Sequence, residues 1–244
     1  MTDSRAVGTP GPAPTIQLGS APILSARSVT RVFGTGATQV AACTDISLDA
    51  YPGEMLVIRG RSGSGKTTLL NVLGALDRPT SGTVMLGEVD ISAATESALV
   101  DIRRNDFGFI FQSFGLIPVL SAAENVEVPL RLVGLDQKAR DARVRELLAA
   151  VGLTKHAEQR PSELSGGQQQ RVAIARALAS NPRVLFADEP TGQLDSATGS
   201  AMMELFASVV RDQRVAAVVT THDPILMARA DRVIELHDGR MLAE

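Results

Sequence analysis

The stretch from Gly60 to Thr67 combines residue types at a spacing suited to binding a phosphate. It reads Gly-Arg-Ser-Gly-Ser-Gly-Lys-Thr and fits the pattern G-x-x-x-x-G-K-[ST] at every defined position. Its glycines allow backbone N–H groups to turn inward around an anion, at which the positive end of a following helix also points. Lys66 would reach the β and γ phosphates, and the Thr67 hydroxyl would hold Mg²⁺ beside them. The pattern predicts nucleotide contacts from Gly60, Arg61, Ser62, Gly63, Ser64, Gly65, Lys66, Thr67 and Thr68.

Two adjacent acids follow the apolar run from Val184 to Ala187, which suits a strand buried on both faces. Asp188 can hold Mg²⁺ through water, and Glu189 can polarise an attacking water or accept its proton. Gln112 ends another compact apolar run, Phe107 to Phe111. Its carbonyl can accept Mg²⁺ and its amide can orient water, which suits a sensor of the γ-phosphate. Taken singly, Gln112 is typical of a solvated loop and the acids of a surface pair, but the strand ends favour a site.

A second anion-binding surface is predicted where residues 164–168 read Leu-Ser-Gly-Gly-Gln. Ser165 and Gln168 have the spacing of a capping box, which indicates the start of a helix. Gly166 and Gly167 leave the first turn without side chains, so an anion can approach its free N–H groups closely. The capping box alone indicates only an ordinary helix start, whereas the five-residue string is far more specific.

The segments that must position these residues predict an α/β fold. Apolar runs, typical of strands covered on both faces, occupy residues 55–58 and 184–187, and further strands are predicted at 215–221 and 233–236. Alternating apolar and polar residues at 23–33 and 46–51 indicate half-buried strands of an antiparallel flank. The phosphate loop leads into residues 68–76, which are compatible with a helix. Asp238 and Gly239 suggest a hairpin turn.

An inserted helical lobe is predicted from residue 113 to about residue 165, where the sequence changes character. Pro118 and Pro129 punctuate its helical stretches. Its clearest apolar face consists of Val144, Leu147, Leu148 and Val151. We therefore expect one domain, residues 22–244, with a core of 22–112 and 166–244 around this helical subdomain.

Composition restricts the classes of function. The chain has 244 residues, with 24 Lys and Arg against 27 Asp and Glu, so no sequence-wide positive field attracts nucleic acid. Cys43 is the only cysteine, which excludes an intrachain disulfide and favours a reducing compartment. No run approaches the ~18 apolar residues of a membrane span, so we expect a soluble polypeptide. Residues 1–21 mix Gly, Pro, Ala, Ser and Thr without periodicity and predict a disordered tail.

The phosphate loop alone leaves the reaction open, because kinases, GTPases, helicases and transport ATPases share it. Together with the Leu-Ser-Gly-Gly-Gln string, however, it resembles the nucleotide-binding subunits of ATP-binding-cassette (ABC) proteins, whose family signature is that string. The resemblance covers roughly residues 22–244. It implies a P-loop NTPase core of the RecA-like type, with a mostly parallel sheet, an antiparallel β flank and an inserted α-helical subdomain. It also implies that Ser165, Gly166, Gly167 and Gln168 of one subunit contact ATP held by a second copy, in a head-to-tail homodimer.

Further residues take their roles from this resemblance. Residues 191–196 match the family's D-loop, in which Asp195 communicates across the dimer. His222 matches the switch histidine that hydrogen-bonds the γ-phosphate, whereas His156 and His237 are interpreted as structural or surface residues. Phe33 matches the adenine-stacking position, where tyrosine is commoner; alone it would more often be a packing residue. The expected catalytic groups are Glu189, His222, Gln112 and Lys66, and the expected Mg²⁺ ligands are Thr67, Gln112 and Asp188.

Within the family, the segments 76–82, 107–120 and 191–195 resemble the MacB, LolD and FtsE type, associated with macrolide export, lipoprotein release and cell division. Gln193 departs from the Asn that is usual in close relatives. The resemblance implies an ATPase that closes on two ATP molecules and drives a separate integral membrane permease of the MacB, LolD or FtsX type. Such a subunit would be cytoplasmic and peripheral on the cytoplasmic face of the membrane.

Two other classes of function remain to be weighed. One is a soluble ABC ATPase acting on DNA or ribosomes. A second cassette, a coiled-coil insertion or an excess of basic residues would support this class. The sequence has none of these, and we expect no nucleic-acid partner. The other is a module that binds ATP only to change shape. The complete set of Lys66, Asp188, Glu189 and His222 argues against it.

Overall fold

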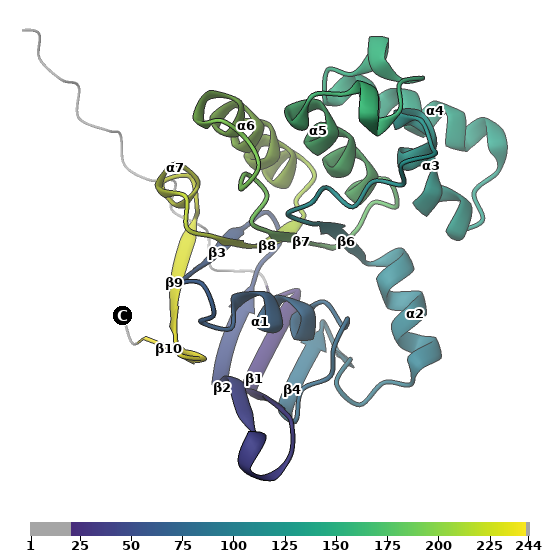
Figure 1. Cartoon of the computed structure of the whole chain (residues 1–244). Coiled ribbons are helices and arrows are strands. Elements are labelled where there is room, and N and C mark those ends of the chain that lie inside the picture. Colours follow the sequence, from purple (N-terminus) through teal and green to yellow (C-terminus); the bar gives the residue numbers. More distant parts are fainter. Residues whose placement is uncertain (1–20, 243–244) are drawn as a thin grey trace, which may run out of the picture.

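A six-stranded sheet forms the centre of the computed structural model, which describes residues 21–242 (Figure 1). The predicted disordered tail, residues 1–21, lies outside the described residues apart from Ala21. The strand order is β10-β9-β3-β8-β7-β6, and all neighbours are parallel except β10 and β9. The strands are β3 (Met55–Arg59), β6 (Phe107–Ile110), β7 (Val184–Asp188), β8 (Ala216–Thr221), β9 (Arg232–His237) and β10 (Arg240–Met241).

Both faces of the central strands are buried, which explains their continuously apolar sequences. In β3, Met55 and Val57 join one core cluster, whereas Leu56 and Ile58 join the other. Successive side chains of a strand point to opposite faces, so a run without polar residues is required where both faces are covered.

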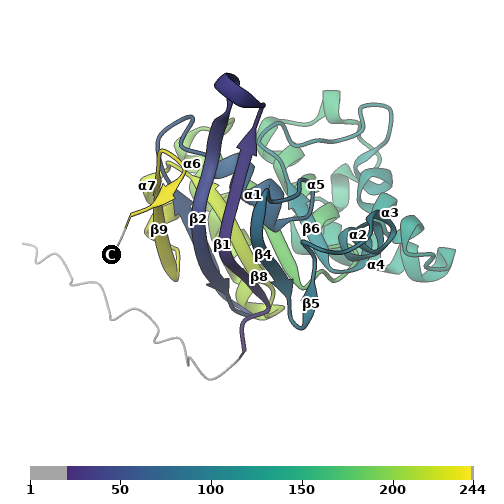
Figure 2. The ribbon, with the colours of Figure 1, turned by 90° about the horizontal axis from the view of Figure 1, so that it is seen from below.

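The predicted antiparallel flank is a second, four-stranded sheet with the order β2-β1-β4-β5, seen face-on in Figure 2. Its strands are β1 (Leu24–Phe33), β2 (Val40–Ala50), β4 (Ser81–Leu86) and β5 (Val89–Asp90). Alternate residues of β1 and β2, among them Leu24, Ala26 and Ile46, are fully buried in the core between the two sheets. The other face is more exposed, as the alternating sequence indicated.

Helices cover both faces of the six-stranded sheet (Figure 1). Helix α1 lies between the two sheets, whereas α5 and α6 pack on the opposite face with Met55 and Val57. The helices are α1 (Lys66–Leu73), α2 (Glu96–Asn105), α3 (Ala122–Leu132), α4 (Gln137–Ala150), α5 (Gly166–Ala177), α6 (Ser196–Asp212) and α7 (Pro224–Met227), with 3₁₀ turns at Gly36–Thr38, Thr154–His156 and Pro161–Glu163. Within residues 21–242, none of the helices combines the length and apolar character that crossing a membrane would require.

Two helix positions differ from the sequence-based expectation. Helix α1 begins at Lys66 rather than at residue 68, because Gly65 is its N-cap in a left-handed conformation and the loop turns directly into the helix. Pro129 lies inside α3 instead of ending a helix. A proline there removes a backbone hydrogen bond, but Val126 and Leu130 on either side are buried in the core, so packing maintains the helix through it.

Candidate nucleotide site

Four loops that carry polar residues meet at one edge of the six-stranded sheet. The strands β3, β8, β7 and β6 are parallel neighbours, so their carboxyl ends lie at the same edge. The phosphate loop 60–67 follows β3, His222 follows β8, Asp188 and Glu189 end β7, and Gln112 follows β6. Ligands of open α/β sheets bind at this edge.

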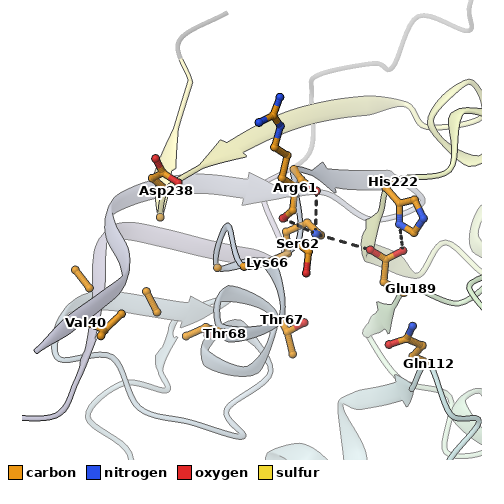
Figure 3. A pocket seen from close by; sticks show the side chains of 16 residues that line it. Val40, Arg61, Ser62, Lys66, Thr67, Thr68, Gln112, Glu189, His222 and Asp238 are labelled. Atoms are coloured by element: carbon orange, nitrogen blue, oxygen red, sulfur yellow. Dashed lines mark hydrogen bonds and ion pairs between the residues drawn. The ribbon is translucent and has the colours of Figure 1, made fainter. Parts of the chain in front are cut away.

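These loops line a cavity of about 820 Å³. Its lining consists of Val40, Ala41, Ala42, Gly60, Arg61, Ser62, Gly63, Gly65, Lys66, Thr67, Thr68, Gln112, Glu189, His222, Asp238 and Gly239. In Figure 3, Val40 and Asp238 lie on one side of Lys66, and Glu189, His222 and Gln112 lie on the other. The phosphate loop therefore separates a first wall, at Val40 and Asp238, from a second wall, at Glu189, His222 and Gln112.

Lys66 lies at the centre of this cavity and is almost buried, with 8% of its surface exposed. Its ammonium donates to the backbone carbonyls of Gly60 at 2.9 Å and Arg61 at 3.2 Å. Its nitrogen lies 3.8 Å from Glu189 Oε1 (Figure 3). An ammonium has three N–H donors, so two brace the loop while the third can donate to an anion, and the positive charge lies between the loop and Glu189.

Asp188 precedes Glu189 of the second wall but does not itself line the cavity, and residues of two neighbouring elements, α1 and β8, position its carboxylate. The Thr67 hydroxyl lies 3.0 Å from one carboxylate oxygen, and the Thr220 hydroxyl donates to the other at 2.5 Å. Thr220 is completely buried in β8, directly opposite Asp188 in the parallel ladder. The hydroxyl of Thr67, the carboxylate of Asp188 and the amide carbonyl of Gln112, which lines the same cavity as Thr67, are oxygen donors of the kind that Mg²⁺ prefers, so these groups fit that ion.

Glu189 and His222 form a direct pair. His222 Nδ1 lies 2.9 Å from Glu189 Oε2, and the Glu189 side chain is 14% exposed against 76% for the histidine. Glu189 has a left-handed backbone, with φ of +46°, and its N–H donates to the Thr220 carbonyl at 3.0 Å. Left-handed backbone is uncommon for residues other than glycine and occurs at functional sites. The carboxylate can therefore accept a proton from water while the exposed imidazole contacts a ligand.

The first wall was not anticipated from the sequence. It combines the start of β2, residues 40–42, with the β9–β10 turn at Asp238 and Gly239. The Gly239 N–H donates to the Ser64 carbonyl at 3.0 Å, and its carbonyl accepts from Thr44 N–H at 2.7 Å. The Asp-Gly pair correctly predicted a hairpin, but no local signal indicated that this turn would be bonded to the phosphate loop.

Cys43 lies beneath the phosphate loop. It is completely buried, and its thiol donates to the Gly65 carbonyl with a sulfur–oxygen distance of 3.7 Å. Burial raises the pKa of this thiol to about 11, so it remains protonated at neutral pH and acts as a packing group rather than as a nucleophile.

Phe33 lies outside the cavity lining, on the neighbouring strand. It pairs with Val40, which does line the cavity, and its ring is 42% exposed. The guanidinium of Arg31 lies over one face of the ring, 4.4 Å from its centre. The ring thus stands at the rim beside the first wall, and its proposed contact with adenine remains a prediction.

The predicted second anion surface is a separate feature of the molecule, at the N-terminus of α5. Ser165 is the N-cap and forms a reciprocal capping box with Gln168, as predicted. Among the described residues, we find no acceptor for the N–H groups of Gly166 and Gly167. None of the residues 165–168 lines the cavity at the phosphate loop, so one chain does not bring the two anion surfaces together.

Two further predicted contacts lie just outside the main cavity. Asp195 accepts the Thr198 N–H at 3.0 Å and lines a smaller cavity of about 290 Å³. His222 lines both cavities, so the segment that carries Asp195 adjoins the second wall. Ser64 is buried behind the phosphate loop rather than exposed to the cavity.

The amino-acid sequence of the chain is similar to those of known proteins. Residues 43–192 match the family described as ABC transporter, which is more than half of the chain. The chain is 48% identical over 220 residues to the macrolide export ATP-binding/permease protein MacB of Salmonella typhimurium strain LT2, and 47% identical over 221 residues to MacB of Escherichia coli strain K12. These alignments cover 90% and 91% of this chain but 34% of each relative, so the chain spans about a third of the length of these relatives.

Two solved structures are similar over nearly their whole length. One is a dimer of the ATP-binding cassette MJ0796 in a post-hydrolysis state bound to ADP and Pi, with a TM-score of 0.83 and 40% identity. The other is a dimer of MJ0796, described as a bacterial ABC transporter cassette, with the same TM-score and 41% identity. Each comparison covers 90% of this chain and 97% of the other.

Proposed function

The chain belongs to the ABC transporter family and is an ABC ATPase, and we propose that it closes as a head-to-tail homodimer on two ATP molecules to drive a separate membrane permease. The proposal is carried by one observation. The second wall of the cavity and the signature helix α5 are both formed in one chain, yet residues 165–168 at the start of that helix do not line the cavity. A second copy would supply the signature to each phosphate loop.

Each group of the cavity has a role in this proposal. The residues Gly60, Arg61, Ser62, Gly63, Ser64, Gly65, Lys66, Thr67 and Thr68 would surround the phosphates. Thr67, Gln112 and, through water, Asp188 would hold Mg²⁺, which when bound neutralises phosphate charge. Glu189 would orient and deprotonate the attacking water, while His222 and Gln112 would respond to the γ-phosphate. Phe33 would stack on the adenine from the rim.

The signature would complete the site from the partner copy. The first N–H groups of α5 and its helix dipole favour an anion, and glycine at positions 166 and 167 allows close approach. Ser165 and Gln168 brace this helix start through their capping box, and Asp195 would contact the partner beside it. The MJ0796 cassette is described as a dimer, which supports a dimer of this chain.

The coupled process is proposed from the relatives. The MacB proteins are named as ATP-binding and permease proteins for macrolide export, and this chain matches a third of their length. We infer that its core, residues 22–112 and 166–244, binds ATP, and that the helical lobe of about 113–165 contacts a permease at the cytoplasmic face of the membrane. Among the described residues, nothing favours a nucleic-acid function.

The decisive experiment compares Glu189→Gln with the wild type and with Lys66→Ala. We expect Glu189→Gln to bind ATP, lose hydrolysis by about 10²- to 10⁴-fold as for removal of a general base, and accumulate ATP-loaded dimers in sedimentation velocity. Lys66→Ala is the matched control, which should weaken ATP binding and form no such dimers. Normal turnover by Glu189→Gln would remove that residue from its role, and unchanged affinity in Lys66→Ala would contradict the phosphate-loop assignment.

A further inference from the structure

His156 contacts the signature glutamine from the helical lobe. Its Nε2 lies 3.3 Å from the side-chain nitrogen of Gln168, and its Nδ1 lies 2.6 Å from Gln159 Oε1. The sequence alone indicates only a structural or surface role for this histidine. The contact places it directly against the motif that is proposed to hold the partner's nucleotide.

The orientation of the Gln168 amide follows from its other contact. The backbone N–H of Ser165 lies 2.8 Å from Gln168 Oε1, and a backbone N–H can only donate, so the atom facing it must be the carbonyl oxygen. The amide nitrogen of Gln168 therefore points at His156. Since that nitrogen carries two N–H donors and no acceptor, His156 Nε2 must accept.

The tautomer of His156 is then determined. A neutral imidazole has one N–H, and because Nε2 accepts, the proton must be on Nδ1. The Nδ1–H donates to Gln159 Oε1, which is an acceptor at hydrogen-bond distance. Each of the three contacts in the series from Gln159 through His156 and Gln168 to Ser165 then joins one donor to one acceptor.

The turn that carries His156 is fixed to the rest of the lobe. The carbonyl of Gln159 accepts from Ala122 N–H at 2.8 Å, and the carbonyl of Ala157 accepts from Ala123 N–H at 2.9 Å. Both donors lie in the first turn of α3. These hydrogen bonds hold the segment that contains His156 against the start of α3. The imidazole therefore has a defined position from which it can contact the Gln168 side chain.

We propose that His156, as the Nδ1–H tautomer, is a positioning residue for the signature: it holds the Gln168 amide across the N-cap Ser165 and thereby fixes the first turn of α5 for the partner's nucleotide. This inference rests on the proposed head-to-tail dimer. Loss of the acceptor frees the amide, loosens the capping box and leaves the N–H groups of Gly166 and Gly167 less well oriented. ATP binding at the chain's own phosphate loop is unaffected, because His156 does not line that cavity.

The test uses three proteins in the Glu189→Gln background: the parent, His156→Leu and His156→Gln. Leucine removes the acceptor at similar size, whereas glutamine places an oxygen near the position of Nε2. One hydrogen bond of ordinary net strength changes an equilibrium constant about fivefold, and the symmetric dimer contains two, so His156→Leu should weaken ATP-dependent dimerisation about 25-fold. His156→Gln should stay near the parent, and binding of a fluorescent ATP analogue to the monomers should be equal in all three.

The outcomes separate this inference from the proposed function. Equal dimerisation of the parent and His156→Leu, or equal loss in both variants, would overturn the positioning role. Failure of the parent to dimerise would instead overturn the proposed function. In either case the tautomer is measured on the monomer by long-range ¹H–¹⁵N NMR. The chain has three histidines, and His156→Gln assigns the signal; an Nε2–H tautomer would contradict the hydrogen bond.

Discussion

Replacement of Gly65 by alanine should disrupt the phosphate loop through two separable effects. Gly65 has a φ of +99°, and a Cβ built on it would overlap the backbone carbonyl oxygen of Ala42 in β2. The left-handed backbone costs a residue with a Cβ about 1–2 kcal/mol. Overpacking typically adds about 1–3 kcal/mol, and Ala42 has little room to move because β2 is paired along β1. We therefore expect Gly65→Ala to lower the free energy of unfolding by about 2–5 kcal/mol.

Gly63→Ala provides the matched control. Gly63 also has a left-handed backbone, with φ of +79°, but no atom lies within 4 Å of the position that a Cβ would occupy, so only the backbone cost of about 1–2 kcal/mol applies. The chain has no Trp and one Tyr, so urea unfolding is best followed by far-UV circular dichroism, with equal m-values required for the comparison. Gly65→Ala should also weaken ATP binding more, since it displaces the start of α1. Equal destabilisation of the two variants would refute the close approach of Gly65 to β2.

Two further predictions concern the signature helix and a buried acid. A Cβ at Gly167 would lie 2.5 Å from Thr198 Cγ2, whereas at Gly166 the nearest atom is 3.7 Å away. In urea unfolding we expect Gly167→Ala to cost about 1–2 kcal/mol more than Gly166→Ala, and Thr198→Ser, which removes that methyl group, to recover the loss; no recovery would disprove the clash. Burial raises the pKa of Glu54 above its ordinary value, although Arg232 opposes the rise. The folded state therefore holds the proton more strongly, and this stabilisation is lost as pH rises through the folded-state pKa. As pH rises above about 4, the ordinary pKa of a glutamate, the wild type should lose unfolding free energy relative to Glu54→Gln, and the opposite trend would mean that pairing with Arg232 outweighs burial.

The features predicted from the sequence are those encoded in short segments. The phosphate loop, the capping box of Ser165 and Gln168, and the apolar strand before Asp188 each depend on neighbours within about ten residues. The physical causes are local: glycine conformational freedom, a side chain that caps its own helix, and burial of successive residues on both faces of a strand. For these segments the structure agrees with the expectation.

The features missed by the sequence depend on contacts between distant segments. Asp238 and Gly239 reach the cavity only because β9 lies beside β3 and its hairpin is bonded to Ser64. A single histidine forms no recognisable sequence motif, so the sequence indicates only a structural or surface role for His156. Its contact with Gln168 is formed only when the helical lobe has folded. Helix propensity depends on the local sequence, so it indicates a break at Pro129. The packing that maintains α3 depends on contacts with distant segments, which helix propensity does not describe.

The acid pair shows how one distant residue can organise a site. Thr220 is a polar residue within a completely buried strand, which is unfavourable unless its hydroxyl is hydrogen-bonded. Its hydroxyl donates to Asp188, and its carbonyl accepts the N–H of Glu189, so β8 fixes both acids through one residue. Asp188 also accepts the Thr67 hydroxyl of the phosphate loop, and Glu189 pairs with His222, two residues beyond Thr220.

A closed set of hydrogen bonds thus connects the phosphate loop, β7 and β8. Because Thr220 and His222 lie on the same short segment, a phosphate oxygen that displaced the exposed imidazole would act on the backbone that supports both acids. The residue proposed to detect the γ-phosphate and the residue proposed to activate water are therefore joined by a direct contact of 2.9 Å. In this proposal, binding of the γ-phosphate at His222 would be transmitted to Glu189 through this one contact.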